Sequence, residues 1–199
     1  MRFESPLYPV YDVHHNQRVR GRGHTRASFA PSGHMSSWYP RGRRISPRWT
    51  YIVLHHSATD TGGASRFDKY HRQNNGWDEL GYHFVIGNGT DTPDGSVEVG
   101  PRWYKQKHGA HCKTPGNYYN EHGIGICLVG DFTVTRPTPR QLASLEHLVR
   151  FLCEECGIPT DRVTTHDAIK RTTRCPGRYF EVQALRRALT SPPTASIMP

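Results

Sequence analysis

The stretch WTYIVLHH, residues 49–56, decides the fold. It is a continuous run of aromatic, β-branched and aliphatic residues that ends in two histidines, which is the pattern of a short buried strand. Functional residues of α/β proteins gather at the carboxyl ends of such strands. His55 and His56 therefore mark the edge of the sheet at which we expect a site.

Predicted helices and further strands follow this run. A short helix is expected over SRFDKYHRQN (65–74), capped by Ser65, and strands are expected over GYHFVIGNG (81–89), SVEVG (96–100) and GIGICLVGDF (123–132). The clearest helix is TPRQLASLEHLVRFLCEECG (138–157), with a start signal at Thr138 and Pro139 and a stop signal at Gly157. Its apolar stripe consists of Leu142, Leu145, Leu148, Val149, Leu152 and Cys153.

The carboxyl-terminal part completes the pattern. DRVTTHD (161–167) predicts a short strand or extended segment that delivers His166, and GRYFEVQALRRAL (177–189) predicts a helix built on Phe180, Leu185 and Leu189. This order of elements predicts a mixed α/β fold, in which helices flank a central mixed β-sheet. We assign residues 49–190 to this domain and residues 191–199 to a flexible tail.

Residues 1–48 are strongly basic. They hold nine Arg, no Lys and two acidic residues, Glu4 and Asp12, and so carry seven of the nine excess positive charges of the chain. Because this part is rich in Gly, Pro and Ser and has little hydrophobic periodicity, we expect an irregular arm rather than a domain. Two interpretations stay open: a solvated tail, or a tether to a polyanion such as wall teichoic acid, lipid head groups or nucleic acid.

Composition limits the other classes of protein. The chain of 199 residues is 35% hydrophobic, which suits one domain with tails. No stretch approaches the roughly 18 apolar residues of a membrane span, and the first residues lack the apolar run of a secretory signal. The sequence therefore predicts neither a transmembrane segment nor an export route, and it leaves the compartment open. A monomer is the default expectation for the oligomeric state.

Five scattered cysteines do not form a disulfide framework, so we expect mostly reduced thiols. Cys153 and Cys156 form a CEEC pair on the long predicted helix, and a pair without two further ligands is interpreted as ordinary thiols.

Residues far apart in the chain have the chemistry of a metal site. His166 and Cys175 lie nine positions apart in THDAIKRTTRCPG (165–177), and the His55–His56 pair offers another imidazole. Two imidazoles and one thiolate suit Zn²⁺, and three protein ligands leave its fourth position open for water. The pattern predicts hydrolytic rather than structural zinc.

Several segments together resemble a known family. YIVLHHSAT (51–59), GWDELGYHFVIGNG (76–89), GAHC (109–112), YNEHGIGICLVGDF (119–132) and HDAIKRTTRCPG (166–177) are similar, in this order, to zinc-dependent N-acetylmuramoyl-L-alanine amidases of type 2. That superfamily includes phage endolysin amidases and peptidoglycan recognition proteins, and the similarity spans roughly residues 49–182. The resemblance implies that His55, His166 and Cys175 bind the zinc ion.

The same resemblance implies catalytic groups at Tyr82 and Thr173. Tyr82 would orient the zinc-bound water or donate to the oxyanion, and Thr173 would hydrogen-bond the carbonyl oxygen. Both groups titrate too high to be good bases at neutral pH, so the proton carrier stays open, with His111 and His56 as alternatives. Another branch of the family has a glutamate and an aspartate where this chain has Cys127 and Cys175, so the chain resembles the Tyr/Cys branch.

Two function classes follow from the resemblance. The first is hydrolysis of the amide between N-acetylmuramic acid and L-alanine in peptidoglycan or muropeptides. The second is a peptidoglycan-binding recognition module without catalysis; such members typically lack the Cys ligand, so the presence of Cys175 favours the enzyme. A nucleic-acid-binding protein would explain the basic arm and none of the motifs, and no such partner is predicted. The expected place of action is the bacterial envelope or the cytosolic muropeptide pool.

Overall fold

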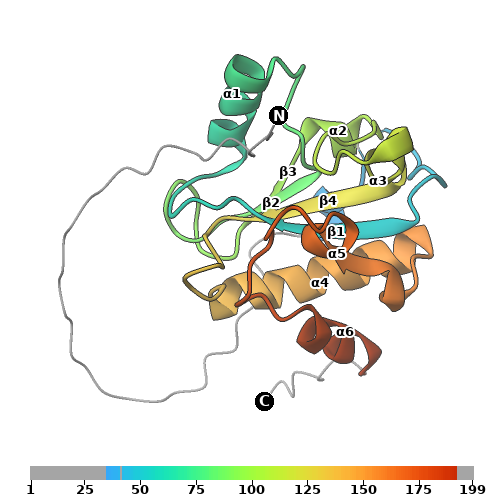
Figure 1. Cartoon of the computed structure of the whole chain (residues 1–199). Coiled ribbons are helices and arrows are strands. Elements are labelled where there is room, and N and C mark those ends of the chain that lie inside the picture. Colours follow the sequence, from blue (N-terminus) through green and yellow to red (C-terminus); the bar gives the residue numbers. More distant parts are fainter. Residues whose placement is uncertain (1–34, 41, 192–199) are drawn as a thin grey trace.

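The computed structural model describes residues 35–40 and 42–191, and its centre is a five-stranded sheet (Figure 1). The strands are β1 (Tyr51–His56), β2 (Phe84–Ile86), β3 (Val97–Val99), β4 (Gly123–Leu128) and β5 (Val163–Thr165). Their order across the sheet is β3-β2-β4-β1-β5. Strand β1 is parallel to β4 and β5, and β2 is parallel to β4 but antiparallel to β3. The predicted mixed sheet is confirmed.

Helices lie on both sides of this sheet. They are α1 (Ala64–Asn75), α2 (Pro101–Tyr104), α3 (Tyr118–His122), α4 (Pro139–Cys156), α5 (His166–Ile169) and α6 (Val182–Thr190), with short 3₁₀ helices η1 (Met35–Trp38), η2 (Pro115–Asn117) and η3 (Thr160–Arg162). In Figure 1, α4 and α6 lie on one side of the sheet, and α1, α2 and α3 lie on the other. No helix in the described part of the chain has the length and apolar character needed to cross a membrane.

The two faces of the sheet differ in chemistry. Because strand side chains alternate, neighbouring residues of β1 and β4 point to opposite faces. The α4 face carries large apolar side chains that form the main core, among them Ile52, Leu54, Ile124, Ile126 and Leu128. The other face carries His55 beside Cys127 and Val53 beside Gly125 in the β1–β4 register, and it is named here the site face.

Helix α4 begins and ends where the sequence predicts. The Thr138 hydroxyl accepts the N–H of Gln141, and the Gln141 side chain accepts the N–H of Thr138, which closes a capping box. Gly157 ends the helix in the left-handed conformation. The prediction that Leu142 belongs to the apolar stripe that packs on the sheet is wrong, because this residue is 44% exposed. Gln141 faces the sheet instead and donates to the carbonyl of Ile86 at the end of β2 and to that of Val129 directly after β4.

The boundaries of other elements differ from the expectations. Helix α1 begins at Ala64 rather than at a Ser65 cap, because the Glu98 carboxylate of β3 accepts the Ala64 N–H at 2.9 Å. Strand β2 is shorter than expected, so Tyr82 lies just before it. Helix α6 begins only at Val182, although Phe180 is buried as predicted. Helices α2 and α3 were not predicted from the sequence.

All five cysteines are free, in agreement with the expectation of mostly reduced thiols.

Packing begins before the expected boundary at residue 49. Trp38 is fully buried, its carbonyl accepts the Trp103 indole N–H at 2.5 Å, and its ring lies 5.4 Å from that of Phe151. Trp38 thus joins the end of the basic segment to the core, and Tyr39 and Ile45 of the same segment also pack there, without any hydrophobic periodicity around them. Residues 1–34 and 192–199 lie outside the described residues, so the irregular arm and the flexible tail stay predictions.

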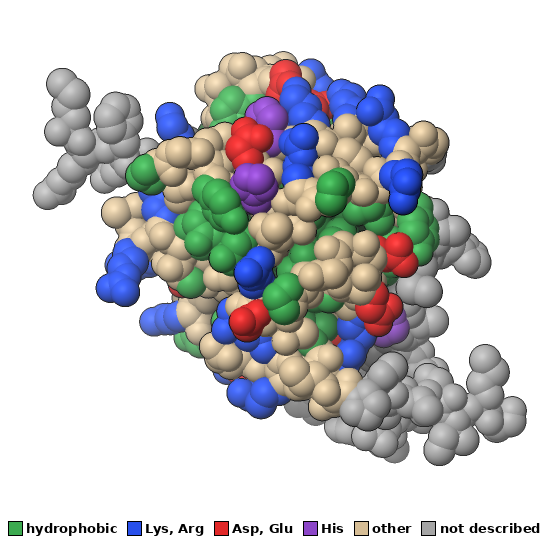
Figure 2. Space-filling model, turned by 90° about the vertical axis from the view of Figure 1, so that its right-hand side faces the viewer, with side chains coloured by type: hydrophobic (Ala, Val, Ile, Leu, Met, Phe, Trp, Pro, Cys, Tyr) green, Lys and Arg blue, Asp and Glu red, His purple; other side chains and the backbone are tan. Residues whose placement is uncertain are grey.

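Basic side chains occur at several places on the visible surface. Figure 2 shows one face of the molecule, on which several Lys and Arg side chains lie together at the upper right and others are spread among acidic and apolar ones. Residues 1–48, most of which lie outside the described residues, hold most of the excess charge of the sequence.

A buried arginine fixes the loop that precedes Tyr82. Arg102 is 2% exposed and donates to the carbonyls of Leu80 and His108 at 2.6 and 2.8 Å and to Asp78 at 2.5 Å. We expect Arg102→Met to lower the free energy of unfolding by roughly 2–5 kcal/mol, because it leaves buried acceptors without donors.

Chemical denaturation measures this loss, and Arg66→Met is the matched control. Arg66 is exposed and donates twice to Asp91, so its removal is expected to cost less than about 1 kcal/mol. Equal losses in the two variants would contradict the role given to Arg102.

Candidate metal centre

Sheet register brings two histidines together. Strand β1 pairs with β5 in a register that sets Leu54 opposite Thr165, so the next residues along the two strands are His55 and His166. Adjacent strands lie about 4.8 Å apart, and the two imidazole rings are 4.8 Å apart. His55 is the penultimate residue of β1, and His166 follows β5 directly as the first residue of α5. Both histidines therefore lie at the carboxyl ends of parallel strands, the edge of the sheet at which the sequence predicts a site.

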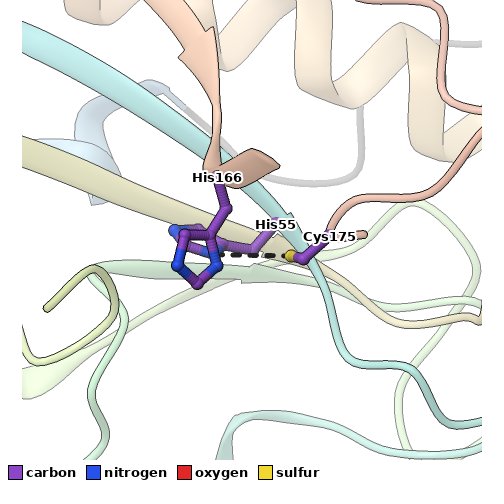
Figure 3. A group of neighbouring side chains, drawn as sticks. All are labelled: His55, His166 and Cys175. Carbon is purple, nitrogen blue, oxygen red and sulfur yellow. Dashed lines mark hydrogen bonds between the residues drawn. The ribbon is translucent and has the colours of Figure 1, made fainter. Parts of the chain in front are cut away.

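Cys175 reaches the same place on the loop that follows α5 (Figure 3). The Asp167 N–H donates to the Cys175 carbonyl at 2.7 Å, and the His56 N–H donates to Cys175 Sγ at 3.4 Å. Gly177 has φ +105°, and a Cβ at this position would overlap the backbone of Phe132. Glycine therefore allows the loop to pack this closely. The thiol is held 3.6 Å from His55 Nδ1.

The three side chains fit a zinc ion. Their ligand atoms all lie within 4.8 Å of one another. Zn–S and Zn–N bonds of about 2.3 and 2.0–2.1 Å at a tetrahedral angle give an S···N separation of about 3.6 Å, which is the distance found here between Cys175 and His55. His166 Nε2 is buried and has no hydrogen-bond partner among the described residues.

Burial keeps both imidazoles neutral and the thiol protonated. It lowers the pKa of His55 well below 6.5, with the nearby His166 acting in the same direction, and it lowers the pKa of His166 to about 4. Burial raises the pKa of the Cys175 thiol to about 12. Neutral imidazoles are ready ligands at neutral pH, whereas the thiol must lose a proton to a cation before it can bind.

The second histidine of the pair points elsewhere. His56 Nδ1 accepts the Phe132 N–H at 3.1 Å and lies 3.7 Å from Asp131. Its side chain therefore stabilises the turn after β4 and lies outside the group, although its backbone N–H contacts Cys175. His55 Nε2, in contrast, lies 3.0 Å from His111 Nδ1.

The two predicted catalytic residues lie beside the group, and both are half-buried. The Tyr82 ring is 5.3 Å from that of His55, and its hydroxyl hydrogen-bonds to the thiol of Cys127, the neighbour of His55 in the register. The Thr173 hydroxyl accepts the Cys175 N–H at 3.2 Å. Tyr82 thus flanks the group from the sheet, and Thr173 braces the loop that carries the thiol.

Sequence reasoning missed a histidine that supports Tyr82. His71 of α1 accepts the Gly81 N–H at 3.1 Å, and its ring lies 5.6 Å from Tyr82 and 4.7 Å from Trp77. Burial lowers its pKa to about 4, so it is a neutral acceptor. The available signal was its helical spacing from Phe67, which places both side chains on the buried face of α1.

Residues 45–178 match the family described as N-acetylmuramoyl-L-alanine amidase. The chain belongs to this amidase family. The similarity includes peptidoglycan-recognition protein 2 of Holotrichia diomphalia, 28% identical over 152 residues, which are 71% of this chain and 75% of that protein. The human N-acetylmuramoyl-L-alanine amidase is 32% identical over 111 residues, 55% of this chain but only 17% of the human protein.

Among solved structures, the amidase LysC of Clostridium intestinale superimposes with a TM-score of 0.60 at 29% identity, covering 74% of this chain and 90% of that one. The family resemblance inferred from the motifs is confirmed, as is the amidase-type fold. Relatives named as amidases and relatives named as recognition proteins both occur, so family membership leaves catalysis and recognition open.

We expect the amidase-family chain to bind one Zn²⁺ with an affinity that rises about tenfold per pH unit between about pH 6 and pH 8. One proton leaves Cys175 on binding, while the histidines are already neutral in this range. His166→Ala should weaken zinc binding more than about 100-fold. Loss of a residue that only hydrogen-bonds to a metal ligand already lowers metal affinity about 10- to 100-fold, and His166 is itself a proposed ligand.

Titration against a chromophoric chelator measures both effects. His56→Asn, which keeps an acceptor for the Phe132 N–H, is the matched control and should bind zinc as the unmodified chain does. An affinity that is independent of pH, or equal losses in the two variants, would count against this ligand set.

Proposed function

We propose that the chain is a zinc-dependent amidase that hydrolyses the bond between N-acetylmuramic acid and L-alanine in peptidoglycan or muropeptides. The observation that carries the proposal is the convergence of His55, His166 and Cys175, two neutral imidazoles and one thiol, at the carboxyl ends of parallel strands. The family name and the names of LysC and the human relative support the same activity.

Three ligands leave one position of a tetrahedral ion for water, as hydrolysis requires. Zinc bound there would polarise the scissile carbonyl and lower the pKa of a water molecule to about 7. The residues of the chain would then orient the water, stabilise the oxyanion and deliver a proton to the leaving amine of L-alanine.

Tyr82 and Thr173 are the proposed catalytic groups. Tyr82 lies against His55, and its hydroxyl would exchange the hydrogen bond to the Cys127 thiol for one to the water or the oxyanion. The Thr173 oxygen accepts a backbone N–H, so its own proton stays available for the substrate carbonyl. His111 is a poor candidate for the proton carrier, because both of its ring nitrogens are engaged within the protein. Tyr82 is the better supported carrier.

The alternative function is a recognition module that binds peptidoglycan without cutting it. The name of the Holotrichia relative favours this alternative. The contact between Cys175 and His55 favours the enzyme, because a module without catalysis has no need of a thiol ligand. In either case the partner is peptidoglycan or a muropeptide, and polyanion binding through residues 1–48 remains a separate proposal that rests on charge alone.

Purified peptidoglycan incubated with the zinc-loaded protein should release free L-alanine amino termini. A chelator should abolish the release and added zinc should restore it. Cys175→Ser should lower it at least about 100-fold, because a serine hydroxyl is a poor zinc ligand at neutral pH.

A sedimentation assay with the same peptidoglycan separates the two functions. Binding without release by zinc-loaded protein would establish the recognition module and defeat the amidase. Neither binding nor release would defeat both.

Tyr82→Phe should lower kcat by about 10²- to 10⁴-fold and leave zinc affinity unchanged, because the variant loses a proton donor and no ligand. Tyr119→Phe is the matched control, since Tyr119 packs on Tyr51 at the opposite end of β1. Steady-state kinetics on a muropeptide measure the effect, and a kcat close to that of the unmodified chain would remove Tyr82 from the mechanism.

A further inference from the structure

The ring of His111 occupies a space on the site face that two glycines leave free. A Cβ on Gly125 of β4, or on Gly109 of the preceding loop, would overlap the His111 imidazole. His111 is 8% exposed. The sheet thus provides a defined recess for this one side chain, directly beside His55.

One asparagine fixes the backbone that carries the ring. Asn120 Oδ1 accepts the N–H groups of both His111 and Cys112 at 2.8 Å, and the Asn120 carbonyl accepts the Gly109 N–H at 2.9 Å. Asn120 is itself 5% exposed and donates to Asn117 at 2.7 Å. Hydrogen bonds to Asn120 therefore fix the backbone before and after His111.

The hydrogen bonds of the ring define its tautomer. His111 Nε2 lies 3.2 Å from the carbonyl of Gly123, which can only accept, so this nitrogen carries the proton. In the neutral imidazole, Nδ1 is then an acceptor, and it lies 3.0 Å from His55 Nε2. His55 must donate from Nε2, which leaves the lone pair on its Nδ1, the atom that faces Cys175 at 3.6 Å.

We infer that His111 is a positioning residue that holds His55 in the Nε2-protonated tautomer, with Nδ1 presented to the metal. The inference rests on the proposed zinc function and adds a residue to it. An acceptor behind a ligating imidazole fixes the orientation of the ring and raises its basicity, and losing such a partner costs about 10- to 100-fold in metal affinity. His111 acts through His55 and needs no contact with substrate.

Two amide substitutions separate this role from simple packing. His111→Asn places an oxygen near the position of Nδ1 and keeps the acceptor for His55, whereas His111→Gln extends past this position toward Gly123. Zinc affinity, measured by chelator competition, should fall about 10- to 100-fold in His111→Gln and His111→Ala. It should stay close to the unmodified value in His111→Asn. His147→Asn, on the exposed side of α4, controls for loss of a histidine elsewhere.

A spectroscopic measurement on metal-free protein tests the tautomer directly. Nitrogen-15 correlation spectra should show His55 protonated at Nε2 in the unmodified chain and in His111→Asn, and a mixture of tautomers in His111→Gln. If His111→Ala does not fold, as judged by circular dichroism, the comparison of Asn with Gln still decides the question.

The outcomes distinguish this inference from the proposed function. If the unmodified chain binds zinc while the Gln and Ala variants keep the same affinity and tautomer, the inference is wrong and the zinc site stands. If the unmodified chain binds no zinc, the proposed function fails, and the tautomer spectra still show whether His111 controls His55.

Discussion

The parallel pairing of β5, β1 and β4 is the constraint on which the rest depends. Parallel strands end at the same edge of a sheet, and the backbone hydrogen bonds fix which residues stand side by side. His55 has Cys127 as its partner on one side and continues the register toward His166 on the other. Residues more than a hundred positions apart thus meet because of the ladder, before any metal contributes. The ladder in turn is held by the apolar α4 face and by a smaller apolar cluster on the site face, and their burial offsets the cost of burying the imidazoles beside them.

The sequence was sufficient for those parts of the fold that depend on local pattern. The run before His55 predicts β1, the capping residues predict both ends of α4, and the order of the predicted strands and helices predicts a mixed sheet. The sequence was insufficient where a contact with a residue far away in the chain determines a boundary or the burial of a side chain. A carboxylate on β3 sets the start of α1, and burial in the core fixes Trp38 within a stretch of no periodicity. Helices α2 and α3 are too short to leave a periodic signal.

The candidate site shows the same division. The residue types and the resemblance to the amidase family identified His55, His166 and Cys175, and the structure brings their side chains together. The strand pattern alone does not tell which face each histidine of the pair occupies, since a shift by one residue exchanges the two, and only the resemblance selected His55. The hydrogen-bond chain from the carbonyl of Gly123 through His111 to His55 was equally hidden, because it depends on the space left by Gly125. Side chains of this kind are visible only once register and loop positions are known.

The contrast between the two faces of the sheet has a consequence for how such a chain can diverge. Beneath the sheet, aliphatic side chains of similar volume are largely interchangeable, so neutral drift can accumulate there. The site face also carries a smaller apolar cluster that includes Phe67 and Val85, but its imidazoles, thiols and glycines each contact one particular neighbour, and hardly any exchange there preserves the arrangement. Related chains can therefore lose most of their sequence identity and keep the same site chemistry, provided that the substitutions fall on the α4 face of the sheet.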